Sequence, residues 1–417
     1  MYFLYSGFLY CMYFLVVLAA FWNDKARCWL QGQRATQKFI HQFANQVPET
    51  SPLYWFHCAS LGEFEQARPL LEEIRKRNPS IRILLTFFSP SGYEIQKKYP
   101  LATYVLYLPL DIPMFLLPFL DAFKPTVFFL AKYDFWPNLI SLLYKRKIPI
   151  FAFSTVFRPS QIYFKSYGSF FRNTLKKVTF LFTQEKKSVD LLIQNGITQT
   201  AFAGDTRMDR VVQIASNPQT FPNLSKETAR FFVAGSIWKK DFQLIKPLIQ
   251  QFPTLHFILV PHEIHEEQIQ KWIYELSSYS ITRWSDWSIK KDAPLPKILL
   301  VDTIGILSSL YATATFAYIG GAWNKGLHNT LEAAVYGIPL FFGSKKYTSF
   351  PEANDLIALG AAFPVRDSAQ LSHHLVQLLN SKETYEQTVS TARNYVHQKA
   401  GATTIILKKI EEMACIP

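Results

Sequence analysis

The sequence has few cysteines and no arrangement of them that binds a metal. Its 417 residues contain four, namely Cys11, Cys28, Cys58 and Cys415, with no CxxC pair and no cysteine and histidine cluster at zinc-site spacing. A disulfide framework and a zinc module are therefore excluded as the basis of the fold. We expect reduced thiols in a cytoplasmic protein.

Acidic residues are also scarce. The chain has 31 Asp and Glu against 44 Lys and Arg, a formal net charge of +13, and this favours polyanionic partners: nucleic acid, anionic lipid or phosphorylated substrates. No arginine-rich or RNA-recognition motif is present, so we expect no nucleic-acid partner. Aromatic residues make up 16% of the chain, which suits a protein that works at a membrane surface.

The first segment, Met1–Trp22, contains no charged side chain. At ~1.5 Å per residue a helix of this length spans about 33 Å, enough for the hydrocarbon core of a bilayer. Lys25, Arg27, Arg34 and Lys38 follow it and place the rest of the chain on the cytoplasmic side. A signal peptide would need a basic leader and a small-residue cleavage site. We predict an uncleaved anchor over residues 1–22, either spanning the membrane or lying in its interface.

After the anchor, apolar runs of strand length alternate with amphipathic helical patterns, which is typical of parallel sheets covered on both faces. The predicted strands are Tyr54–Cys58, Arg82–Phe87, Thr126–Leu130, Ile148–Phe153, Val178–Thr183, Phe231–Ala234, Leu255–Val260, Ile298–Val301 and Phe316–Ile319. The pattern weakens between Ile214 and Glu227. We therefore predict two doubly wound, Rossmann-like α/β domains, 36–216 and 225–417, the second including the terminal helices, with a ligand cleft between the carboxyl ends of their sheets.

Two acidic residues follow predicted strands of the first domain. Glu63 opens a helix after the turn Ala59–Gly62, where a carboxylate can serve as a general base or merely complement the helix dipole, worth ~0.3–1 kcal/mol. Asp134 lies in the turn Lys132–Asn138, and is either the second carboxylate of a catalytic pair or an N-cap.

The glycine-rich segment Gly320–Glu332 leaves a strand and opens a helix in the second domain. Its backbone N–H groups can bind phosphate, and Glu332 can accept ribose hydroxyls. The alternative is an ordinary helix start. The segment matches neither GxGxxG nor a Walker loop, which excludes a dinucleotide fold and a P-loop NTPase.

Further polar residues end strands of the second domain or form a basic group in the first. Ser236, Pro261 and His262 follow strands, and His262 and His328 could contact a phosphate or base, or be structural. The basic group consists of Arg158, Lys165, Arg172, Lys176, Lys177, Lys186 and Lys187. It would face anionic headgroups or a phosphorylated acceptor, or simply solvent.

Taken together, these segments resemble the 3-deoxy-D-manno-octulosonic acid (Kdo) transferases, from about Lys25 to the end of the second domain. The segments that carry the resemblance are Ser60–Glu63, Ser89–Gly92, Tyr107–Asp111, Phe135–Asn138, Gly204–Asp209, Ala234–Ser236, Val260–Pro261, Gly320–Gly321 and His328–Glu332.

The resemblance implies a GT-B glycosyltransferase that moves Kdo from CMP-Kdo to a lipid A precursor (lipid IVA) in lipopolysaccharide biosynthesis, at the cytoplasmic face of the inner membrane. It implies inversion at the anomeric carbon, with no metal and no cofactor. Glu63 would be the general base, and Asp134 and Arg207 would stabilise the transition state. The donor would contact Ser236, Pro261, His262, Ile304, Gly305, Ile306, Gly321, His328, Asn329, Thr330, Leu331 and Glu332. The acceptor is expected near Ser60, Arg158 and Lys165.

Four positions depart from the family pattern. Asp134 stands where glutamate is common, Arg207 where lysine is common, His262 in place of an arginine and Ile306 in place of an acidic residue. Two alternatives therefore remain. One is a GT-B transferase that uses a UDP-sugar on a lipid acceptor. The other, motivated by His262 and Ile306, is a membrane-tethered binding protein without catalysis.

Overall fold

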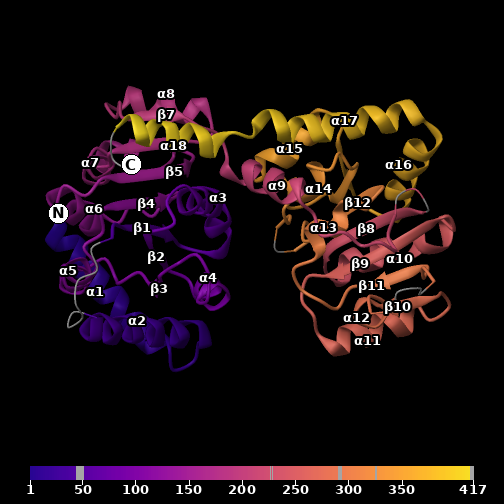
Figure 1. Ribbon diagram of the computed structural model, residues 1–417, viewed down its shortest axis with the longest axis horizontal. Coiled ribbons are helices and arrows are strands. Elements are labelled where there is room, and N and C mark those ends of the chain that lie inside the picture. The colour runs from indigo at the N-terminus through magenta and orange to yellow at the C-terminus, as the bar shows by residue number, and fades with distance from the viewer. Residues whose placement is uncertain (44–50, 226, 228, 290–293, 325, 414–417) are drawn as a thin grey trace. The chain divides into compact units, whose positions relative to one another are not determined.

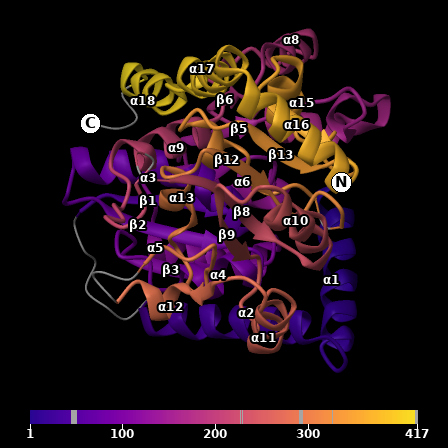
Figure 2. The same cartoon turned by 90° about the vertical axis from the view of Figure 1, so that its right-hand side faces the viewer.

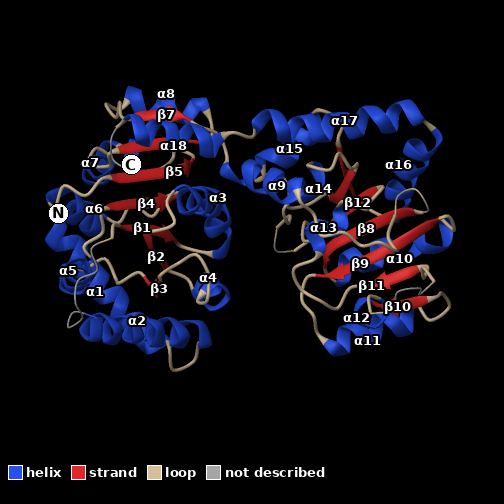
Figure 3. Ribbon diagram, in the orientation of Figure 1, coloured by secondary structure: helices blue, strands red, loops and turns tan. Residues whose placement is uncertain are grey.

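The computed structural model describes residues 1–43, 51–225, 227, 229–289, 294–324 and 326–413, and these form two compact units. The first unit contains Met1–Arg210 and the stretch from Ala400 onward, and the second contains Val211–Lys399. In each unit a parallel sheet is covered by helices (Figures 1 and 3). Cys415 and the loop residue Lys325 lie outside the described residues.

The first unit is built on a seven-stranded sheet. Its order is β3 (Tyr104–Tyr107), β2 (Arg82–Phe87), β1 (Leu53–Cys58), β4 (Val127–Ala131), β5 (Ile150–Thr155), β6 (Phe180–Thr183) and β7 (Thr200–Phe202), with every pair parallel. The chain builds outward from β1 to β3 and then returns to the other side of β1 with β4. The strand order therefore reverses between β1 and β4, and ligands of such sheets bind at the carboxyl ends of the strands at this point.

Alternate residues of the central strands enter two different cores. Trp55 of β1 packs in the core formed with α2 (Asp24–Phe43), α5 (Pro113–Phe123), α6 (Pro137–Lys145), α7 (Ser169–Leu175) and α8 (Lys186–Gln194). Its neighbours Tyr54 and Phe56 pack in the opposite core with α3 (Leu61–Arg77). Both faces of β1 are thus buried, which is why its sequence reads as a continuous apolar run.

The C-terminal helix α18 (Ala402–Glu412) belongs to the first unit. Ile406, Leu407 and Ile410 lie in the same core as α3, and Asp209 accepts the N–H of Thr403 at 2.7 Å. The terminal helices were expected to stay with the second domain, 225–417. The chain instead crosses back after α17 (Lys382–Lys399), because the apolar face of α18 completes the covering of the first sheet.

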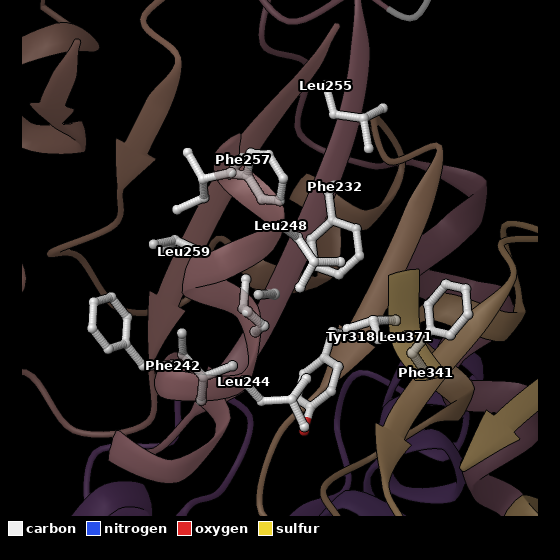
Figure 4. Packing of buried hydrophobic residues seen from close by; sticks show 14 of the residues in the cluster. Phe232, Phe242, Leu244, Leu248, Leu255, Phe257, Leu259, Tyr318, Phe341 and Leu371 are labelled. Atoms are coloured by element: carbon white, nitrogen blue, oxygen red, sulfur yellow. The ribbon is translucent and has the colours of Figure 1, made fainter. Parts of the chain in front are cut away.

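The second unit repeats the topology. Its order is β10 (Ile281–Arg283), β11 (Ile298–Leu300), β9 (Leu255–Pro261), β8 (Arg230–Ile237), β12 (Phe316–Ile319), β13 (Leu340–Gly343) and β14 (Ala362–Val365). The helices are α9 (Thr206–Ser216, which starts in the first unit), α10 (Lys239–Gln251), α11 (Glu266–Glu275), α12 (Trp284–Trp287), α13 (Leu307–Tyr311), α14 (Leu331–Ala334), α15 (Pro351–Ala358), α16 (Ser368–Asn380) and α17. In the core, Phe232 and Phe257 of the sheet pack with Leu248 of α10 and Leu371 of α16 (Figure 4). The strand order here reverses between β8 and β12.

The N-terminal helix α1 (Tyr2–Ala19) packs against the first unit along one side. Leu9 is buried against the core that contains Trp29, Asn138 donates a 3.0 Å hydrogen bond to Ser6, and Lys177 donates a 2.7 Å hydrogen bond to the Tyr2 hydroxyl. Helix α2 follows at a steep angle to α1 (Figure 2). Within the described residues, α1 is the helix long and apolar enough to cross a membrane, judged by length and composition alone.

Candidate active site

Glu63 and Asp134 follow the two neighbouring strands at the switch point of the first sheet. Glu63 lies in the first turn of α3, directly after β1. Asp134 lies between β4 and α6, and β1 pairs with β4 along its length. The carboxyl ends of parallel neighbours lie at one edge of a sheet, so the two carboxylates share one edge.

The environment of Glu63 favours the protonated form of its carboxyl group. Burial raises the pKa of Glu63, the charge of Asp134 raises it further, and the Ala59 N–H, His57 and Lys132 oppose the rise. The Ala59 N–H donates to Oε2 of Glu63 at 2.5 Å, which fixes the carboxylate close to its own strand end. A carboxylate of raised pKa is a stronger base, provided that it is ionised at the working pH.

Asp134 has a partner that the sequence analysis missed. Nε2 of His57, a fully buried residue of β1, lies 3.4 Å from Oδ2 of Asp134. The signal was available, because a histidine inside the apolar run Tyr54–Cys58 must find polar partners in the interior.

Arg207 is held by an acidic neighbour. Its Nε and Nη2 donate to one oxygen of Asp205 at 2.9 and 2.7 Å, and its backbone N–H donates to the other oxygen at 2.9 Å. The preceding residue, Thr206, donates from its hydroxyl to the carbonyl of Gln66 on α3 at 2.7 Å. The start of α9 is therefore fastened to the helix that carries Glu63.

Three strand ends have a strained backbone. Lys132, Ser154 and Ser236 adopt φ angles of 62°, 54° and 53°, in the left-handed region that costs a non-glycine residue about 1–3 kcal/mol. They lie just after β4, at the end of β5 and at the end of β8. Such strain is characteristic of functional sites.

In the second unit, Gly320 and Gly321 allow the loop after β12 to lie against the end of β8. A Cβ at Gly320 would come within 2.2 Å of the Ser236 carbonyl oxygen, and one at Gly321, whose φ is +95°, within 2.7 Å of the His328 ring. No other residue type fits this path. The backbone is thus brought close to Ser236 and His328, two of the predicted donor contacts.

Three aromatic rings stack at this edge of the second sheet. Trp238 lies 4.4 Å from His262, and His262 lies 4.3 Å from His328, measured between ring centroids. The rings come from the ends of β8, β9 and the loop after β12. The structure therefore brings His262 and His328 together and adds Trp238, which the sequence analysis did not identify.

Buried Asp241, at the start of α10, holds this stack to its loop. It accepts the N–H of Trp238 at 2.8 Å, the N–H of Gly321 at 3.3 Å and the hydroxyl of Tyr318 at 2.9 Å. Burial raises the pKa of Asp241, and these hydrogen bonds oppose the rise. The carboxylate thus replaces the solvent that these buried donors have lost.

The segment His328–Glu332 contains half-buried polar residues and two buried residues. Asn329 donates to Glu332 at 3.0 Å and accepts the N–H of Leu331 at 3.2 Å. Thr330 and Leu331 are 1% and 0% exposed, so their side chains pack in the interior, which leaves His328, Asn329 and Glu332 to offer side chains to a ligand. The helix expected from His328 onward is confined to α14.

The remaining donor candidates lie at neighbouring strand ends. Pro261 is buried at the end of β9. After β11, Ile304 is 89% exposed, Gly305 has φ +94°, and Ile306 precedes α13. An exposed isoleucine beside a glycine in an unusual conformation leaves the backbone accessible.

The acceptor candidates are spread over two strand ends of the first sheet. Ser60 is the N-cap residue of α3, three residues before Glu63. Arg158 is exposed in the loop after β5, and half-buried Lys165 lies between the short helices η1 (Ile162–Phe164) and η2 (Ser166–Gly168). Ser60 is therefore next to the proposed base, and the two cations belong to another strand end of the same sheet.

Comparison with known proteins finds similarity to one family of glycosyltransferases. The family model of 3-deoxy-D-manno-octulosonic-acid transferase (kdotransferase) matches residues 33–210. The 3-deoxy-D-manno-octulosonic acid transferase of Aquifex aeolicus is 29% identical over 79% of this chain and 86% of its own. That of Chlamydophila psittaci is 25% identical over 86% of this chain and 84% of its own.

The chain is similar to the Kdo transferases over most of its length. The span matched by the family model contains Glu63, Asp134 and Arg207. Among solved structures, UDP-GlcNAc 2-epimerase from Neisseria meningitidis, bound to UDP-GlcNAc, aligns with a TM-score of 0.61 at 16% identity, covering 87% of this chain and 100% of its own. This likeness shows the fold, two Rossmann-like units of the GT-B kind, which confirms the predicted fold class.

Proposed function

We propose that this protein moves Kdo from CMP-Kdo to the lipid A precursor lipid IVA in lipopolysaccharide biosynthesis, with Glu63 as general base. The observation that carries the proposal is the position of Glu63: a half-buried carboxylate of raised pKa at the switch point of the first sheet. The relatives are named as transferases of this sugar.

In the proposed reaction, an acceptor hydroxyl attacks the anomeric carbon of Kdo while Glu63 takes its proton. The bond from that carbon to the CMP phosphate breaks, and CMP leaves with the electron pair. Arg207, oriented by Asp205, offsets negative charge on the leaving group or the sugar. Asp134 positions groups beside Glu63. Direct displacement inverts the anomeric centre and needs neither metal nor cofactor.

The donor is proposed to bind at the carboxyl edge of the second sheet. The Trp238, His262 and His328 stack offers aromatic surface and imidazole donors, the Gly320–Gly321 turn offers close backbone approach, and Glu332 suits ribose hydroxyls. Such a combination fits a nucleoside monophosphate ester.

Helix α1 is proposed to lie in the interface of the inner membrane, with both units on its cytoplasmic side. Its docked side contacts Asn138 and Lys177 of the first unit. The other side presents large apolar residues to the surroundings, namely Phe3, Leu4, Phe8, Phe14 and Leu15. A helix held on one side by a folded unit and apolar on the other suits burial in one leaflet, next to a lipid acceptor.

A transfer assay tests the function. Purified protein is incubated with lipid IVA and CMP-Kdo generated in situ, and the lipids are weighed by mass spectrometry beside an active Kdo transferase. A product heavier by one or more Kdo residues is expected. Absence of product, with the control active, contradicts the proposal. Transfer from a UDP-sugar would then indicate the other donor class, and nucleotide binding without any transfer would indicate a binding protein.

A further inference from the structure

A chain of buried hydrogen bonds leads from the interior of the first sheet to Asp134. Nε1 of Trp55 donates to Oγ1 of Thr86 at 2.8 Å. The same Oγ1 lies 3.0 Å from Nδ1 of His57, and Nε2 of His57 lies 3.4 Å from Oδ2 of Asp134. Trp55, Thr86 and His57 are each 0% exposed, so water does not compete with these contacts.

The direction of the chain follows from the chemistry of its first member. An indole N–H can only donate, so Thr86 accepts from Trp55 and keeps its own hydroxyl proton to give. Nδ1 of His57, at 3.0 Å, is a nearer acceptor than the carbonyl of Phe56, at 3.4 Å. If Nδ1 accepts, the proton of the neutral ring is on Nε2, which faces Asp134.

We propose that His57 is a positioning residue for transfer: through Nε2–H it holds the carboxylate of Asp134 in place beside Glu63, and Trp55 and Thr86 set its tautomer. This inference rests on the proposed function. His57 is fully buried in a strand with neighbours on both sides, so its ring is held in place and fixes one oxygen of Asp134.

The charged groups around His57 come from two places in the chain, the start of α3 and the turn after β4. They are Glu63 at the start of α3, with Lys132 and Asp134 after β4; buried Cys58 adjoins it on β1.

The first experiment measures the tautomer without any reaction. The full-length protein is labelled with ¹⁵N-histidine, and His57 is identified by the signals that disappear in His57→Gln. The inference expects a protonated Nε2 and an unprotonated Nδ1. A neutral ring protonated on Nδ1 overturns it, whatever the transfer assay shows.

The second experiment compares matched variants. Thr86→Ser keeps the hydroxyl, whereas Thr86→Val removes it at equal size. His57→Gln keeps an N–H donor, whereas His57→Leu removes it. The comparison uses variants whose unfolding temperature equals that of the wild type. We expect kcat to fall on the order of tenfold in Thr86→Val and His57→Leu, with much smaller changes in Thr86→Ser and His57→Gln. KM for CMP-Kdo should stay close to the wild-type value.

One readout separates positioning from a merely structural role. In an Asp134→Asn background, His57→Leu should lower kcat only slightly further, because its effect on transfer passes through Asp134. Full additivity of the two changes, or a folded His57→Leu with unchanged kcat, overturns the inference. Absence of transfer by the wild-type protein overturns the proposed function instead.

Discussion

The indole N–H of Trp238 donates a 3.2 Å hydrogen bond to Nε2 of His328. Because an indole cannot accept, Nε2 of His328 is the acceptor, and the proton of the neutral ring is on Nδ1. His262 lies against both rings, stacked on His328 and tilted by 31° relative to Trp238. The proposed donor site is therefore a set of rings held in fixed orientation rather than three independent side chains.

Replacing Trp238 by Phe tests whether this orientation matters for donor binding. Phenylalanine keeps the stacking surface and removes the hydrogen bond to His328, a loss of about 1 kcal/mol. We expect the affinity for CMP, measured by isothermal titration calorimetry, to fall roughly fivefold. Trp287→Phe is the matched control, since that indole donates to the Pro294 carbonyl elsewhere in the same unit. Equal CMP affinity in Trp238→Phe and the wild type would contradict the prediction.

Replacing Glu63 by Gln tests the general base. Loss of a positioned base typically costs ~10²–10⁴-fold in rate, so kcat should fall by that order while CMP affinity is retained. Glu65→Gln changes a glutamate on the same helix whose partners are Arg68 and Arg210, and it should stay near wild-type activity. A Glu63→Gln variant with wild-type kcat would remove Glu63 from this role.

The raised pKa of Glu63 also predicts a pH dependence. A general base works only when ionised, so activity should be lost as the pH falls through its pKa, and this occurs at a higher pH than for an ordinary glutamate because burial raises the pKa. The measurement is kcat/KM as a function of pH, over the pH range in which the free enzyme stays folded. Activity that stays constant well below the usual pKa of a glutamate, about 4.3, would be inconsistent with this.

The exposed side of α1 predicts membrane binding. Changing Phe8 and Leu15 to Glu places two charges on the apolar side, where each large apolar side chain contributes about 1.5–3 kcal/mol when buried. Flotation with anionic phospholipid vesicles should show binding reduced on the order of tenfold or more. Tyr274→Glu, at a residue of the second unit that is 82% exposed, is the control and should bind as the wild type does. Unchanged flotation of the double variant would contradict an interfacial role for α1.

Asp111 predicts a pH-dependent stability. It is buried and accepts the N–H groups of Asn138 and Leu139 at 3.0 and 2.7 Å, yet burial raises its pKa from 3.8 to about 6. The folded state thus keeps a proton that the unfolded state has released. The protonated Asp111 therefore stabilises the folded state. This contribution, on the order of 3 kcal/mol, is complete below pH ~4 and is lost as the pH rises through about 6.

Thermal unfolding between pH 4 and pH 7 measures this contribution. The unfolding temperature of the wild type should fall relative to that of Asp111→Asn as the pH rises, because the amide does not titrate. Parallel curves for the two proteins would show that Asp111 has an ordinary pKa.

Much of the fold was predictable from local pattern. The bounds predicted for Arg82–Phe87 and Phe316–Ile319 are those of β2 and β12, because central strands are buried on both faces and read as continuous apolar runs. The edge strands β3, β7, β10 and β14 were missed, and so was the inner strand β13. Residues of β7 and β10 are mostly half-exposed, and such short segments carry little apolar signal.

The sequence by itself also determined that Glu63 and Asp134 stand at strand ends, since the turn after a strand is a local feature. Only the tertiary structure decided what those residues touch. The contacts of His57 with Thr86 and Asp134, and of Trp238 with His262 and His328, join strand ends that are far apart along the chain. The placement of α18 on the first sheet has the same origin. Strand order and helix docking are set by which apolar faces are buried together, a non-local balance that no stretch of sequence expresses alone.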